Sequence, residues 1–66
     1  MSHYSYKMSQ RIAAEDPPFS SFIMAALRKA DSGNFSRLQA AFPRITAEFE
    51  GRYNAPGGYL SGEEVE

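Results

Sequence analysis

The 66-residue chain contains no cysteine and no tryptophan, and it has a single histidine. Without cysteine it can form no disulfide framework, and it has neither a thiol nucleophile nor the ligands of a cysteine-rich zinc site. It also lacks a long apolar run and a charged leader followed by an apolar segment. We therefore expect no membrane span, no membrane partner and a cytoplasmic location.

The chain also lacks an excess of charge of either sign. Seven lysines and arginines against eight acidic residues give a formal net charge of −1. This balance argues against bulk nucleic acid as the main partner. The charges are nevertheless unevenly placed: the stretch from Arg28 to Arg44 is basic, and the charged residues from Ile45 onward are mostly acidic.

Groups that could perform catalysis are scarce. The only histidine, His3, lies in the least patterned segment, where a general base would lack a fixed geometry. Glu48 and Glu50 are two residues apart and therefore point to different sides of a helix. Gly57-Gly58 has neither the lysine nor the preceding strand of a phosphate-binding loop. We expect a protein that is not an enzyme, with no catalytic residues, no metal site and no cofactor.

The clearest secondary-structure signal predicts a helix over residues 17–31. Asp16 can cap its N-terminus, and Pro17 suits the first turn. Gly33, just beyond the predicted end, suits a left-handed position after the helix. Apolar residues recur along one face with helical spacing, at Phe19, Phe22, Ile23, Ala26, Leu27 and Ala30.

Two shorter helices are expected at 34–42, capped by Ser32 or Asn34, and at 43–53, opened by Pro43. In the last of these, Arg52 falls on the apolar side and must extend to solvent or pair with a carboxylate, and Thr46 falls on the exposed side. Short connections force successive helices together. The predicted core consists of Phe19, Phe22, Ile23, Leu27, Phe35, Leu38, Phe42, Ile45, Phe49 and Tyr53.

The predicted fold is therefore all-α: a compact three-helix cluster with a flexible N-terminal arm and an acidic C-terminal tail. Residues 1–15 form the flexible or loosely docked arm. Within it Tyr4, Met8 and Ile12 recur every four residues, so a weak helix is the alternative. Residues 16–54 form the helical domain. Residues 55–66 combine a Gly/Pro stop with the acidic tail, from which Tyr59 and Leu60 could fold back onto the core.

Three segments carry a resemblance. Ala-Leu-Arg-Lys-Ala-Asp (26–31), Arg-Leu-Gln-Ala-Ala-Phe-Pro (37–43) and Arg-Tyr-Asn-Ala-Pro-Gly-Gly (52–58) resemble small uncharacterised proteins carried by phages and prophages. The resemblance spans about half of the chain, residues 26–58, and contains no chemical motif. It implies a phage origin, and proteins of this kind often bind a host protein stoichiometrically, including components of antiviral defence. It implies no role for any single residue.

From these observations we expect a non-catalytic protein-binding module, of a phage type that inhibits or redirects a host factor. Marginal size favours a partner, and self-association is one way to supply it. The alternative is a dimeric helix-turn-helix regulator that reads DNA through Arg37 and Gln39. The exposed residues expected to bind the partner protein are Met24, Arg28, Lys29, Arg37 and Arg44.

Overall fold

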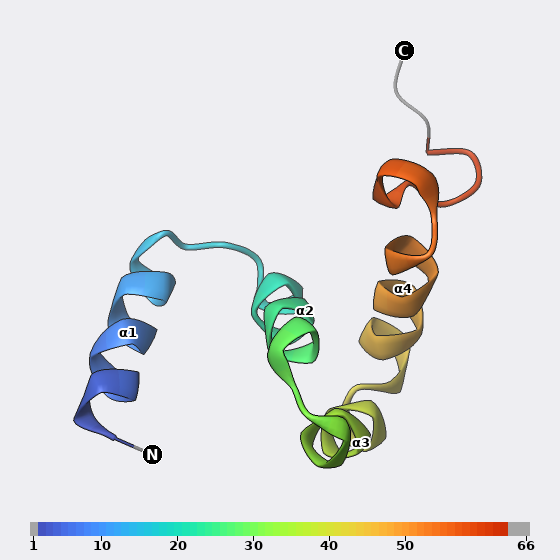
Figure 1. The fold of residues 1–66 in the computed structure, drawn as a ribbon. Helices are drawn as coiled ribbons and strands as arrows, with labels where there is room; N and C mark the ends of the chain where they lie inside the picture. Colours follow the sequence, from blue (N-terminus) through green and yellow to red (C-terminus); the bar gives the residue numbers. More distant parts are fainter. Residues whose placement is uncertain (1, 64–66) are drawn as a thin grey trace.

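The computed structural model describes residues 2–63 and confirms the all-α class. This part of the chain contains four α-helices, one short 3-10 turn and no strand. Figure 1 shows α3 at the bend between α2 and α4, with α1 reached through a linker. The elements are α1 (His3–Ala14), α2 (Phe19–Lys29), α3 (Ser32–Ala41), α4 (Pro43–Tyr53) and η1 (Pro56–Gly58).

Residues 3–14 of the predicted arm form a helix, the alternative that the four-residue spacing of Tyr4, Met8 and Ile12 left open. Ser2 caps α1, because its hydroxyl oxygen accepts a hydrogen bond from the Ser5 amide at 3.1 Å. No Cα atom of α1 lies within 8 Å of a Cα atom in another described helix. The segment therefore has helical structure but no neighbouring helix.

The Pro17-Pro18 pair moves the start of α2 two residues beyond the predicted position, to Phe19. A residue that precedes proline is kept out of the helical region, so neither Asp16 nor Pro17 can be helical. Asp16 was expected to cap this helix. It does not, and its φ is 53°. Pro18 occupies the N-cap position and provides no side-chain hydrogen bond.

The connection between α2 and α3 has the predicted length of two residues but lies two residues earlier in the chain, at Ala30 and Asp31. Asp31 caps α3, with its Oδ1 accepting from the Asn34 amide at 2.8 Å. Gly33 consequently lies inside α3 rather than in a left-handed position after α2. The capping carboxylate starts the new helix at Ser32, earlier than the predicted start at residue 34.

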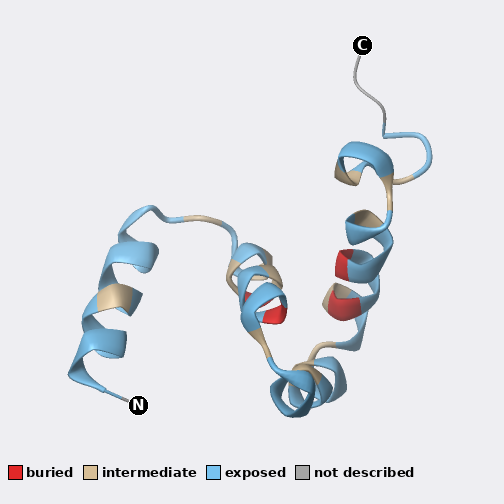
Figure 2. Ribbon diagram, in the orientation of Figure 1, coloured by how far each residue is buried: buried red, intermediate tan, exposed pale blue. Residues whose placement is uncertain are grey.

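The core lies between α2 and α4. Ile23 and Leu27 on α2 and Phe49 on α4 are its buried apolar residues, and Figure 2 shows the buried positions on facing sides of the two helices. α3 packs beneath both helices. The partly buried residues around this core are Met24, Phe35, Leu38, Phe42 and Ile45.

Three expectations about burial were wrong. Thr46, expected to be exposed, has only 1% of its surface accessible, and its hydroxyl donates to the Phe42 carbonyl oxygen at 2.8 Å. Phe19 and Tyr53, expected in the core, are 63% and 66% exposed. Both lie at helix ends, where the neighbouring helices do not cover them.

The C-terminal segment folds back onto α4 through a set of contacts to Arg52, here called the Arg52 clasp. Arg52 Nε donates to Glu48 at 2.9 Å, and its two terminal nitrogens donate to the Glu63 carboxylate at 2.7 and 2.8 Å. Arg52 Nη1 also donates to the Gly58 carbonyl, and Glu63 Oε1 accepts from the Leu60 amide, both at 2.9 Å. The prediction that Arg52 would pair with carboxylates is confirmed.

The clasp also sets the charge state of its members. The Arg52 guanidinium and the Leu60 amide together hold the pKa of Glu63 below its usual range, and the carboxylates raise the pKa of Arg52. Glu63 therefore belongs to a fixed hydrogen-bonded group. Glu64 and Glu66, the other acidic residues of the predicted tail, lie outside the described residues.

Candidate functional site

A groove with basic side chains lies between α2 and α3, here called the α2–α3 groove. Its volume is about 450 Å³. Two alanines and a leucine give it an apolar floor, and two cations and an amide give it a polar rim. The lining residues are Ala26, Lys29, Ala30, Asn34, Arg37 and Leu38.

The rim of this groove carries two positive charges. Lys29 lies in the last turn of α2 and Arg37 lies on α3. The Asn34 side chain accepts a hydrogen bond from Arg37 Nη1 at 3.1 Å, which orients the guanidinium. Within residues 2–63 the carboxylate ion pairs all involve Arg52, so the charges of Lys29 and Arg37 have no carboxylate partner there. The residues that line the groove therefore include two cations and no carboxylate.

A second groove lies on the other side of α2, between α2 and α4, with a volume of about 300 Å³. Arg28 dominates it: its guanidinium carbon lies 5.5 Å from the centre of the Phe49 ring and 5.8 Å from that of Tyr53. These distances are typical of cation–π contacts. Glu50 also lines the groove and offsets the charge of Arg28, so this α2–α4 groove has no net charge.

The structure separates the five residues predicted to bind a partner. Lys29 and Arg37 meet in the α2–α3 groove, whereas Arg28 lies in the α2–α4 groove. Met24 is half-buried and packs against the core, so little of it is available to a partner. Arg44 is exposed in the first turn of α4 and lines neither groove.

Sequence reasoning missed the rest of both grooves. Asn34 was considered only as a cap, yet its side chain accepts a hydrogen bond from Arg37. Tyr53 was placed in the core, although it forms the outer wall of the α2–α4 groove. The spacing of four residues between Phe49 and Tyr53 was the available signal, since such pairs share a helix face.

The described residues were also compared with the requirements of a metal site and of a membrane span. In residues 2–63 no three histidine, aspartate or glutamate side chains come together in an arrangement that could hold a metal ion. None of the helices in this part of the chain is both long enough and apolar enough to cross a membrane. No protein-family model matches the chain, and neither a curated protein nor a solved structure is significantly similar to it.

Proposed function

We propose that the protein is a non-catalytic module that binds an acidic segment of another protein in the α2–α3 groove. One observation carries the proposal: Lys29 and Arg37 lie on the rim of an apolar groove and have no carboxylate partner among the described residues. A segment with an aspartate or glutamate beside a small apolar side chain complements both properties of this surface.

The chemistry of the rim defines how such binding would behave. Both cations are exposed, so they act mainly on the rate of association and on specificity, and salt weakens their effect. The apolar floor formed by Ala26, Ala30 and Leu38 contributes burial that salt does not weaken. A groove of about 450 Å³ accommodates a few side chains rather than a whole helix. We therefore propose recognition of a short exposed segment of the partner.

The resemblance to phage-borne proteins supports a host protein as the partner. Every residue that lines the α2–α3 groove lies within the segment that carries the resemblance, residues 26–58. Stoichiometric occupation of the groove would inhibit or redirect the host protein without any chemical step. In this proposal α2, α3 and α4 form the compact binding module, and the protein acts in the cytoplasm.

Affinity capture from a lysate of the source cells tests the groove when it is run with matched variants. The variant with Lys29→Glu and Arg37→Glu reverses the charge of the rim. Arg44→Glu makes the same kind of change on an exposed helical position outside the groove. We expect wild type and Arg44→Glu to retain the same protein after nuclease treatment, and the groove variant to lose it.

Two outcomes contradict the proposal. Retention of that protein by the groove variant would show that binding occurs elsewhere on the chain. Loss of every partner upon nuclease treatment would favour the alternative function, DNA binding by α3, on which Arg37 and Gln39 are exposed. In that case Gln39→Ala should alter sequence preference, and affinity should fall steeply with salt.

A further inference from the structure

The helix α1 lacks the packing that a helix of its length requires. It has 12 residues, and isolated helices shorter than about 12–15 residues are marginally stable in water even when they are rich in alanine. It packs against no other described helix. Tyr4, Met8 and Ile12 form an apolar stripe along it, in which Tyr4 is 72% and Ile12 48% exposed. The stripe therefore has no partner in this conformation.

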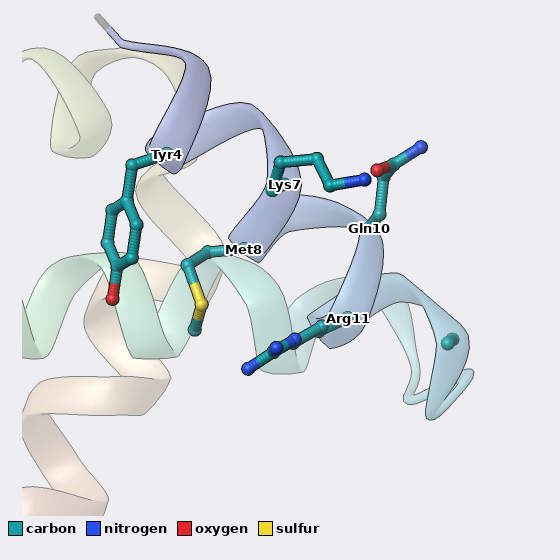
Figure 3. Close-up of a pocket in the computed structure, with 6 residues that line it drawn as sticks. Tyr4, Lys7, Met8, Gln10 and Arg11 are labelled. Carbon is teal, nitrogen blue, oxygen red and sulfur yellow. The ribbon is translucent and has the colours of Figure 1, made fainter.

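The hollow beside the stripe has only one wall. Figure 3 shows Tyr4, Met8 and Arg11 projecting from one side of α1, and the hollow of about 490 Å³ there is lined by residues of α1 alone. Lys7 and Arg11 lie along one edge of the stripe, where their charged ends can reach water when the stripe is covered. A surface that covers the stripe must therefore offer apolar side chains.

The helices α2, α3 and α4, here called the core helices, expose such side chains at the end where the linker from α1 arrives. Phe19 begins α2 and is largely exposed. Its ring packs edge-on against that of Phe42, with the two centroids 5.9 Å apart. Phe42 is half-buried and lies between α3 and α4. These two rings, here called the aromatic patch, are the exposed apolar surface nearest in sequence to the linker.

The charges at this end of the core helices permit the approach of α1. From Phe19 to Leu27, α2 contains no charged residue that would repel the two cations of α1. Arg44 is the exposed cation of the first turn of α4, and the linker itself contains the acidic pair Glu15-Asp16. The two cations of α1 consequently meet no excess of positive charge beside the patch.

The linker can bring the stripe to the patch. It consists of the four residues 15–18, which span up to about 13 Å when extended. Asp16 has a φ of 53°, a left-handed conformation that few residues other than glycine adopt and in which aspartate is enriched. Hinges are formed by a few such linker residues, which absorb large changes of φ and ψ. Rotation about this hinge places Ile12, in the last turn of α1, and Met8 over the patch.

The dimensions of the whole chain indicate that the structure shows an open conformation. A compact monomer of 7.4 kDa exposes about 4,200 Å², whereas this chain exposes 5540 Å². Its radius of gyration is 13.8 Å, against about 11 Å for a compact chain of the same length. Both are properties of the chain as a whole, and folding α1 back onto the core helices reduces both.

We propose that α1 is a lid, hinged at residues 15–18, that closes on the aromatic patch through Met8 and Ile12. The short linker favours this contact over one between two molecules, because it gives the stripe and the patch an effective concentration on the order of millimolar. Closure covers the stripe and Phe19 together and gives α1 the packing that it lacks.

Small-angle X-ray scattering at several protein concentrations tests the lid. Ile12→Glu in the stripe and Phe19→Glu in the patch each place a charge in the closed contact, whereas Ala13→Glu places the same charge on the opposite side of α1. None of the three positions belongs to the buried core. We expect a radius of gyration of about 11 Å for wild type and Ala13→Glu at every concentration. That of Ile12→Glu and Phe19→Glu should rise toward 13.8 Å.

Nuclear Overhauser effects between the Met8 methyl group and the rings of Phe19 and Phe42 provide a second measurement. They should be present in wild type and absent in Ile12→Glu. A wild-type radius of gyration near 13.8 Å without these effects would overturn the proposal, as would a compact Ile12→Glu variant. Association of wild type through the stripe with rising concentration, or binding of phosphatidylglycerol vesicles through it, would also overturn the lid and assign the stripe to that partner.

Discussion

The burial of Thr46 leads to a sharp prediction about its two side-chain groups. The hydroxyl donates to the Phe42 carbonyl oxygen, which also accepts from the Thr46 amide at 3.0 Å. Thr46→Val therefore removes one hydrogen bond, a loss of about 1 kcal/mol, without leaving an unsatisfied buried group. The added methyl group recovers about 0.8 kcal/mol by burial. We expect Thr46→Val to change the free energy of unfolding by less than about 0.5 kcal/mol.

Thr46→Ser provides the contrasting substitution, because it keeps the hydroxyl and removes the buried methyl group. It should destabilise the protein by about 1 kcal/mol, with a further loss if a cavity remains. In a domain of this size 1 kcal/mol corresponds to about 4–8 °C in Tm. Urea unfolding followed by circular dichroism, at one fixed protein concentration, measures both variants. If Thr46→Ser left the stability unchanged while Thr46→Val cost more than about 1.5 kcal/mol, the hydroxyl rather than the methyl group would explain the burial.

Three further predictions concern the core, the clasp and the aromatic pair. Leu27→Ala should cost about 3 kcal/mol in urea unfolding and Phe19→Ala less than about 1 kcal/mol, because only Leu27 is buried; equal losses would contradict the assigned core. The pKa of Glu63 is lowered in the folded protein, so its ion pair with Arg52 stabilises the fold at pH values above the ordinary glutamate pKa of about 4.3. This stabilisation is lost as the pH falls through the lower pKa of the folded state. An NMR titration of the Glu63 side-chain carboxyl carbon should show its inflection at a lower pH in wild type than in Arg52→Gln, which lacks the guanidinium. Arg28→Ala should destabilise by about 0.5–1 kcal/mol through the lost cation–π contacts, and Arg28→Lys by less; identical stability of the three proteins would refute this contribution.

Local patterns were sufficient to predict the helices of the second half of the chain. Pro43 marks the boundary between α3 and α4 as expected, because proline ends one helix and fits the first turn of the next. The end of α2 and the start of α3 were misplaced because the Asp31 carboxylate caps α3 and takes Gly33 into the helix. Competing caps only a few residues apart cannot be ranked from sequence without the surrounding contacts.

Burial and the grooves depend on how the helices cross, which a single-helix pattern does not contain. Thr46 is polar by type, yet it is buried, with its hydroxyl donating to the Phe42 carbonyl oxygen one turn earlier. Arg28 and Lys29 are neighbours in sequence, but they line different grooves because consecutive residues of a helix project in different directions and α2 contacts both α3 and α4. The basic residues were identifiable from composition. Their division between two grooves of different charge was not.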